Sequence, residues 1–413
     1  MTLWILALTG LGLGYVARMA VWASGFRREA RRTDALAGAV PGALADVADH
    51  ALPSLTIVVP ARNEEDTIGP CVDSILATDY PRERLEIIVV DDDSQDRTAE
   101  VVRQRMASAP ARAMAGHELP MTDWDESEGA GRLRLVRIPE NRRRDRAHKK
   151  RAIEKAVAHA RGEIVLTTDA DCVVPPGWPR AMAAQFEGPE VAFVSGSVRY
   201  RLAPDDGLFA RLQALDFFGL MACGAGGIGS GQPNLANGAN VGYRLETFSA
   251  LGGFSGIDHV TSGDDELLMQ KIAYGTPLDV RFCADPGAVV LTEPVRTLRA
   301  FVHQRKRWAS KGAHYPRRLQ RMLLGVGGFF VALVATAVAA LFVPELWPWL
   351  LAGLALKAVG DLLVLVPAAR RFRQLGLLAV YPLHLVLHAP HSLAVAALGS
   401  LGGFEWKDRR LDQ

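Results

Sequence analysis

Acidic side chains follow three separate apolar runs of this 413-residue chain. Asp91 and Asp92 come directly after one run, Asp169 and Asp171 after another, and Glu64 follows a third. A single acidic turn often does no more than cap a helix or start a turn. Carboxylates that converge repel one another unless a cation or a hydrogen-bonding ligand compensates their charge. Three such turns at successive runs therefore indicate a site for a cation or a polar ligand.

The spacing of Asp169 and Asp171 suits a hard divalent cation. Alternate residues just past a strand can face the same side, and Mg²⁺ and Mn²⁺ prefer carboxylate oxygens while ligand oxygens or water fill the other positions. Two carboxylates alone are weakly specific, and their place after a strand is what strengthens the inference. We expect Mg²⁺ or Mn²⁺ here, bound together with a diphosphate.

Short apolar runs and longer helical patterns alternate through the middle of the chain, which is typical of an α/β fold with a doubly wound, mostly parallel sheet. In such sheets ligands bind beyond the carboxyl ends of the strands, where the acidic turns lie. The expected strands are 55–59, 85–90, 133–138, 163–168 and 191–194, and the expected helices are 68–77, 96–106 and 147–160.

Four apolar runs, at 3–23, 322–343, 346–366 and 375–401, have the roughly 20 residues that a membrane-spanning helix needs. No basic residue precedes the first run, while Arg27 and Arg28 follow it, so we expect an uncleaved anchor with its N-terminus outside. The long middle segment would then lie in the cytoplasm, most simply at the plasma (inner) membrane. Pro382 and Pro390 predict that the fourth run is kinked or re-entrant.

The basic residues near the last two runs give conflicting signals about orientation. Those at 370, 371 and 373 agree with a cytoplasmic middle segment, whereas those at 407, 409 and 410 do not. The formal net charge of +2 excludes a nucleic-acid partner, because a duplex-binding surface needs a marked excess of Lys and Arg. The 4 cysteines lack a paired metal-ligand spacing, so we expect buried free thiols.

Six ordered segments between residues 56 and 308 resemble the family 2 glycosyltransferases, which have a GT-A fold. They are residues 56–64, 90–98, 148–153, 168–172, 263–266 and 304–308. The last segment, Gln-Arg-Lys-Arg-Trp, matches the Gln-x-x-Arg-Trp motif of the membrane-bound branch. Departures from the family pattern are Asp93 and His148, where Gly is common, and Asp264, which replaces a frequent Glu.

The resemblance implies a GT-A (nucleotide-diphospho-sugar transferase) domain with a mostly parallel sheet, plus an α-helical transmembrane region. The expected domains are an N-terminal anchor at 1–25, a linker at 26–52, the catalytic domain at 53–295, an interfacial amphipathic helix at 296–320, transmembrane helices at 321–403 and a tail at 404–413.

The resemblance also implies roles for individual residues in an inverting, metal-dependent transfer. Asp265 takes the position of the general base, beside Asp264, and Asp169 and Asp171 take those of the metal ligands. The residues expected to contact the donor, a nucleotide diphosphate sugar and by resemblance a UDP-sugar, are Pro60, Ala61, Arg62, Glu64, Asp91, Asp92, Lys149, Ala170, Gln304 and Arg307. The ring of Trp308 would cover the acceptor, and Asn237 and Asn240, in a loop rich in Asn and Gly, are further acceptor contacts.

Several of these residues have simpler interpretations. Lys149 belongs to a basic run and can be a solvated charge, Asp265 can be the N-cap of a helix, and Trp308 can be an interfacial anchor. His384 and His388, with the histidine at 391, fall on one face of the last run, where they can bind metal, line a polar groove or pack inward.

Three functions remain open from the sequence. The first is transfer of a sugar to a membrane lipid, the second is a processive polysaccharide synthase, and the third is a non-catalytic membrane scaffold that keeps the fold. The number of predicted membrane spans is small, and this favours a lipid acceptor over a channel for a polymer. The oligomeric state is not indicated.

Overall fold

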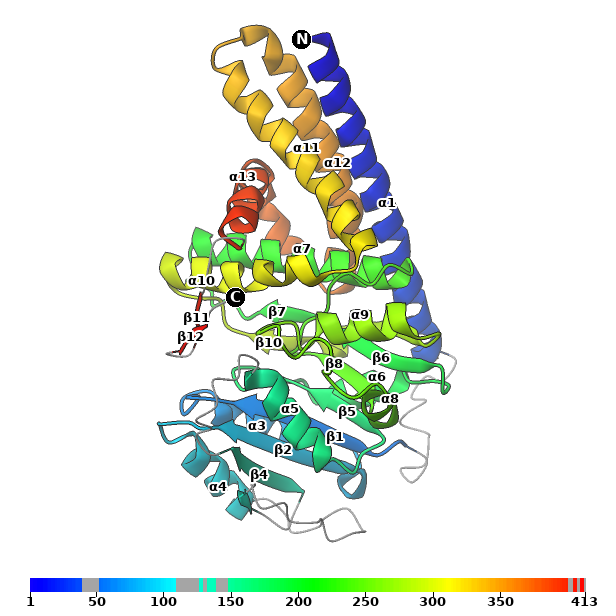
Figure 1. Ribbon diagram of the computed structural model, residues 1–413, viewed down its shortest axis with the longest axis vertical. Coiled ribbons are helices and arrows are strands. Elements are labelled where there is room, and N and C mark those ends of the chain that lie inside the picture. Colours follow the sequence, from blue (N-terminus) through cyan, green and yellow to red (C-terminus); the bar gives the residue numbers. More distant parts are fainter. Residues whose placement is uncertain are drawn as a thin grey trace.

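The computed structural model describes residues 1–38, 52–108, 126–128, 132–138, 148–399, 404–406 and 409–411. A domain built on a large sheet lies at one end, and a helical bundle rises from it at the other (Figure 1). The N-terminus lies at the far end of the bundle (Figure 1). The expected combination of an α/β domain with an α-helical region is confirmed.

The main sheet has the strand order β3-β4-β2-β1-β5-β8-β6-β9. Parallel pairing joins β4, β2, β1 and β5, as well as β6 and β9, so the sheet is mostly parallel as expected. All five expected strands are present, as β1 (Leu55–Ala61), β2 (Leu85–Asp92), β4 (Leu133–Ile138), β5 (Ile164–Thr167) and β6 (Val191–Gly196). The sequence did not predict β3 (Glu126–Glu128), β8 (Val241–Arg244) or β9 (Asp279–Cys283).

Side chains alternate along β1 between two hydrophobic cores. Ile57 and Val59 pack with residues of α3 (Ile68–Leu76) and α4 (Thr98–Ser108), and Val58 packs with residues of α5 (His148–Ala158) on the other face. Successive side chains of a strand point to opposite faces, so a strand covered on both sides reads as a continuous apolar run. Helices cover both faces, and ligands can approach at the carboxyl ends of the strands.

The bundle consists of α1 (Thr2–Gly38), α11 (Arg317–Ala340) and α12 (Trp347–Arg371), which pack side by side (Figure 1). Together with α7 (Leu208–Gly229) and the last helical segment, these helices are long and apolar enough to cross a membrane. However, α7 and α10 (Leu298–Ser310) run across the base of the bundle (Figure 1). Helices in this crosswise position would lie along the membrane surface if the bundle spans the bilayer.

The first helix is longer than expected and joins the two parts of the molecule. Instead of ending near residue 25, α1 continues to Gly38. Gly25 and Gly226 of α7 lie so close that a Cβ on Gly25 would meet the carbonyl oxygen of Gly226 at 2.2 Å. Beyond this crossing, buried Glu29 accepts a 2.9 Å hydrogen bond from the N–H of Phe282 in β9. The predicted linker therefore begins as an ordered helix because it docks on the sheet domain, and residues 39–51 lie outside the described part.

The last apolar run divides just before Pro382, and an α-helix continues through Pro390, where a break was also expected. A short 3₁₀ helix, η6 (Leu375–Val380), precedes α13 (Tyr381–Gly399). Pro382 occupies the first turn of α13, where a missing N–H is tolerated, and Pro390 lies inside the helix. In the same part of the chain, the expected interfacial helix is divided into α10 and η4 (Lys311–His314). All four cysteines are free thiols, as expected, and only Cys223 is partly exposed.

Candidate active site

A pocket opens at the carboxyl ends of β1, β2 and β5, and we call it the strand-end pocket. Nearly all of its lining residues were predicted from the sequence. The predicted residues are Pro60, Ala61, Arg62, Glu64, Asp92, Lys149, Asp169, Ala170, Asp171 and Arg307. Segments far apart in the sequence therefore meet at this edge of the sheet.

Two residues with left-handed backbone conformation lie next in sequence to lining residues of this pocket. Asn63 has a φ of 50° and Asp93 a φ of 57°. Asn and Asp tolerate this conformation better than most residues do, and Gly adopts it without strain, which explains how Asp93 can occupy a position where Gly is common. The guanidinium of Arg62 then donates hydrogen bonds to the carbonyl oxygens of Asp92 and Asp93, at 2.5 and 2.8 Å. This contact fixes the turn after β2 against the end of β1.

Lys149 is the central cation of the pocket. Its ammonium lies 2.7 Å from Oδ1 of Asp169 and 3.0 Å from Oδ2 of Asp264. Burial opposes the charged form of the lysine, but the carboxylates of Asp169, Asp264 and Asp265 outweigh burial and raise the pKa of Lys149. Lys149 is therefore charged and held in place, unlike the solvated member of a basic run.

The residues of the strand-end pocket fit a hard divalent cation. Asp169 and Asp171 both line it and offer carboxylate oxygens, the donor type that Mg²⁺ and Mn²⁺ prefer. The ammonium of Lys149 on Asp169 shows that positive charge is already accommodated beside these carboxylates. Arg307, from α10, lines the same pocket and adds positive charge at its rim. The site can thus hold a cation together with a polyanionic ligand.

Asp265 lies next to this cluster and serves as the N-cap of α9 (Glu266–Gly275). Its carboxylate accepts hydrogen bonds from the N–H of Glu266, at 2.7 Å, and of Gly238, at 2.8 Å. Burial alone would raise the pKa of Asp265, but Lys311, Lys149 and the two amides outweigh it and lower that pKa. The N-cap interpretation is therefore correct, and the same contacts keep the carboxylate ionised.

Lys311 and Glu266 are buried charged groups beside Asp265 that were not predicted from the sequence. Lys311 lies 3.6 Å from Asp265 and 3.2 Å from Glu266, whose carboxylate also accepts a hydrogen bond from the Tyr315 hydroxyl. Burial raises the pKa of Glu266 to about 7, despite Lys311. Lys311 comes from η4, after the predicted motif, so only the folded chain brings it to the site.

Asp265 lines a second pocket, which we call the helix pocket. It is lined by residues of α7, α10, η4, α11, α13 and the loop before β8. Asp265, Asn237 and Trp308 line it together with apolar side chains such as Leu220 and Val395. Asp265 is thus reached from a mostly apolar pocket among the candidate membrane helices.

The ring of Trp308 is part of this pocket. It packs 5.6 Å from the ring of Phe217, and the guanidinium of Arg305 lies 4.3 Å from its centroid. An interfacial anchor would direct its ring away from the protein. The ring of Trp308 is instead packed against Phe217 and Arg305, where it lines the helix pocket.

Three predicted contacts do not fit where the structure places the side chains. Asn240 is fully buried, accepting a hydrogen bond from Trp178 and donating to the carbonyl oxygens of Ser197 and Ala288, so its predicted acceptor contact is wrong. The other two are Asp91 and Gln304. Asp91 is buried, pairs with Arg137 and accepts a hydrogen bond from Ser94, and Gln304 accepts one from Tyr200. Neither lines the strand-end pocket.

Comparison with known proteins identifies the class of this fold and site. Residues 56–114 match the model of glycosyl transferase family 2, and residues 164–369 match that of glycosyl transferase family group 2. A mannosyltransferase from Pyrobaculum calidifontis, solved in complex with GDP-Man and Mn²⁺, superposes with a TM-score of 0.53 at 22% identity, over 94% of this chain and 99% of that one. The fold is therefore the GT-A fold of glycosyltransferases.

Relatives of known name agree with this class. An N-acetylglucosaminyltransferase of Rhizobium meliloti is 26% identical over 387 residues, which cover 87% of this chain and 82% of that protein. The beta-monoglucosyldiacylglycerol synthase of Synechocystis sp. is 28% identical over 266 residues, 63% of this chain but only 48% of that protein. The two family models together match more than half of the chain. The chain belongs to glycosyltransferase family 2 and is a glycosyltransferase.

Proposed function

We propose that this enzyme transfers a sugar, with inversion, from a nucleotide diphosphate donor in the strand-end pocket to a hydroxyl of a membrane lipid in the helix pocket. The observation that carries the proposal is the position of Asp265. It lines the helix pocket, and through its neighbour Asp264 it is joined to Lys149 in the strand-end pocket. A base in this position can reach an acceptor on one side of the transferred sugar while the diphosphate leaves on the other.

In this reaction the carboxylate of Asp265 takes the proton of the acceptor hydroxyl as its oxygen bonds to the anomeric carbon, and the bond from that carbon to the diphosphate breaks. Lys149 and Arg307, which line the strand-end pocket, offset the negative charge on the departing diphosphate. Asp169 and Asp171 would hold Mg²⁺ or Mn²⁺, which supplies further positive charge to the diphosphate when bound. The donor is expected to be a UDP-sugar.

The lining of the helix pocket supports an amphiphilic acceptor. Part of its wall comes from α10, α11 and α13, and apolar side chains such as Leu323 and Val395 line it together with Asp265. A lipid could present its hydroxyl to Asp265 while its chain stays among these helices, avoiding about 0.8 kcal/mol for each methylene that would otherwise enter water. The beta-monoglucosyldiacylglycerol synthase among the relatives is named for a product of this class.

The basic residues of α1 support a cytoplasmic position for the catalytic domain. Arg27, Arg28 and Arg31 lie on α1 toward the sheet domain, and basic residues favour the cytoplasmic side of a membrane. We infer that α1, α11 and α12 span the plasma (inner) membrane and that the catalytic domain is cytoplasmic.

The proposal is tested with purified protein in lipid nanodiscs of defined composition. A panel of labelled nucleotide sugars is supplied with Mg²⁺ or Mn²⁺, and the products are partitioned between organic and aqueous phases. We expect label in the organic phase for the wild type and not for Asp265→Asn. Label found only in a long polymer sensitive to polysaccharide hydrolases would replace the proposal by a processive synthase.

A further inference from the structure

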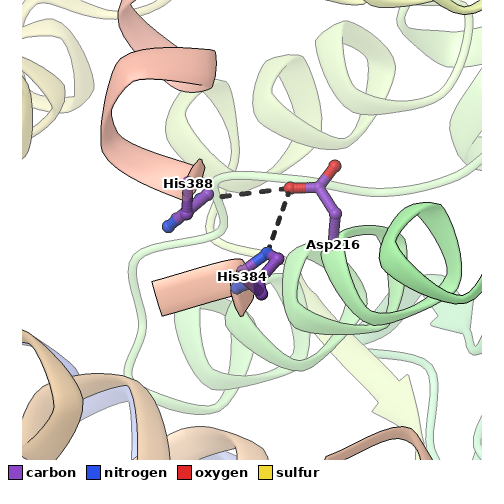
Figure 2. Close-up of side chains that lie close together, drawn as sticks. All are labelled: Asp216, His384 and His388. Carbon is purple, nitrogen blue, oxygen red and sulfur yellow. Dashed lines mark ion pairs between the residues drawn. The ribbon is translucent and has the colours of Figure 1, made fainter. Parts of the chain in front are cut away.

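Two histidines of α13 face an aspartate of α7 at the place where these helices meet. Figure 2 shows His384 and His388 pointing toward the carboxylate of Asp216. Oδ1 of Asp216 lies 3.7 Å from Nε2 of His384 and 4.0 Å from Nε2 of His388. One ligand atom from each of the three residues lies within 4.8 Å of the others. This cluster is separate from the carboxylates of the strand-end pocket.

The two oxygens of Asp216 are divided between different partners. Oδ2 lies 2.8 Å from the guanidinium of Arg305, whereas Oδ1 is the oxygen that faces the imidazoles. Arg305 is held in turn by the rings of Phe301 and Trp308, at 4.8 and 4.3 Å from its carbon to their centroids. Arg305 therefore orients the carboxylate and leaves one oxygen directed at the histidines, as residues behind metal ligands do.

The imidazole nitrogens of the cluster lack ordinary partners. Within the described part of the chain, neither ring nitrogen of His384 has a hydrogen-bond partner, and neither does Nδ1 of His388, although these atoms are buried. Buried polar atoms are normally hydrogen-bonded or bound to a ligand. The two rings stack 4.8 Å apart, which brings their Nε2 atoms to the same carboxylate.

We propose that Asp216, His384 and His388 form a second metal site, which takes a borderline transition-metal ion such as Zn²⁺. Two imidazoles one helical turn apart and one carboxylate are a ligand set that Zn²⁺ accepts, while Mg²⁺ prefers oxygen ligands only. Zn²⁺ holds such ligands at about 2.0–2.2 Å. The two Nε2 atoms and Oδ1 of Asp216 would have to approach one another by about 1 Å, through rotation of the two rings, to bind one ion at these distances. This metal is distinct from the Mg²⁺ or Mn²⁺ proposed at Asp169.

The position of the site gives the metal a structural role in the helix pocket. Asp216 and His388 both line this pocket, and α7 and α13 form two of its walls. An ion bound across them fixes α13 against α7 and keeps Asp216 in place, so that Arg305 stays on the ring of Trp308. We therefore describe the three ligands as positioning residues for the acceptor, which do not touch the reacting atoms.

The test measures metal binding directly, in the full-length protein in nanodiscs after removal of any affinity tag and treatment with a chelator. Co²⁺ replaces Zn²⁺ as a probe because nitrogen ligands give it visible ligand-field absorption. We expect one Co²⁺ per chain in the absence of nucleotide, displaced by Zn²⁺ and not by Mg²⁺. His388→Gln should weaken binding at least about tenfold and change the spectrum.

Matched variants separate this site from the others. Asp171→Asn removes a ligand of the strand-end pocket, and His303→Gln removes a histidine of α10 outside the cluster, so both should bind Co²⁺ like the wild type. His384→Gln provides a second ligand variant if His388→Gln does not fold, as judged by gel filtration. Zn²⁺ should raise the unfolding temperature of the wild type and not that of a ligand variant. The proposal is wrong if the wild type binds no Co²⁺ at micromolar concentration, or if a folded ligand variant binds it as the wild type does.

Discussion

Replacing Asp265 with Asn tests the assignment of the base. The carboxylate accepts two backbone hydrogen bonds, from Gly238 and Glu266, and lies 3.6 Å from the ammonium of Lys311. An amide oxygen can accept only one of the two bonds in the same geometry, because its NH₂ group then faces the other N–H. Loss of one hydrogen bond to a charged group should lower the free energy of unfolding by about 1.5–3 kcal/mol. Loss of the base should lower turnover by about 10² to 10⁴.

The assay follows the release of nucleoside diphosphate in the presence of lipid acceptor, together with donor binding and thermal unfolding. Donor affinity should be nearly unchanged in Asp265→Asn, because Lys149 keeps its contact with Asp169. Asp265→Ser retains an N-cap side chain but no base, so it should be as inactive as the Asn variant. Asp264→Asn, at the neighbouring position, should retain more activity. An active Ser variant, or an Asp264→Asn variant that loses as much as Asp265→Asn, would refute the assignment.

Three further predictions follow from the geometry. Asp171→Asn should nearly abolish turnover and the Mn²⁺-dependent part of donor binding, measured by calorimetry, and full activity of this variant in chelator would contradict the metal site. Because burial raises the pKa of Glu266 to about 7, its protonated form stabilises the fold below about pH 4.5, and this contribution is lost as the pH rises through about 7. The unfolding temperature should therefore fall more for the wild type than for Glu266→Gln between about pH 6 and about pH 8, and equal slopes would refute this. Ala396→Trp, which places a large ring in the helix pocket, should raise the KM for a lipid acceptor without changing donor binding, whereas Ala397→Trp, at an exposed position outside the pocket lining, should leave both unchanged.

The strand-end pocket could be predicted from the sequence because its residues lie in short segments next to strongly apolar strands. A parallel sheet brings the carboxyl ends of its strands to one edge, so Glu64, Asp92 and Asp169 had to be near one another once their strands were identified. Asp91 belongs to the same motif but points into the interior, where it pairs with Arg137. Asp91 and Asp92 are adjacent in the sequence, and their positions alone do not show which of them faces the pocket.

Asp265, Asn237 and Trp308 in the lining of the helix pocket were named from the sequence. Its helical walls could not be predicted, since they come from segments that are distant in the sequence and have no shared motif. One wall of the pocket is α7, which contains several glycines. Glycines usually indicate a turn, but here Gly226 allows α7 to approach α1 closely. Short strands with polar residues, such as β9 with Asp279 and Arg281, lack the apolar run by which the central strands were recognised. Lys311 and Glu266 become a pair only after α9 and η4 have packed together.

The most direct measurement of the central claim is the mass and anomeric configuration of the lipid product. The enzyme in nanodiscs is given a nucleotide sugar with an α-configured anomeric carbon and a single species of acceptor lipid, and the organic phase is analysed by mass spectrometry and NMR. Our account predicts a lipid heavier by one or a few sugar residues, with a β linkage to the acceptor oxygen. A product that retains the α configuration, or sugar found only in a polymer without lipid, would contradict it.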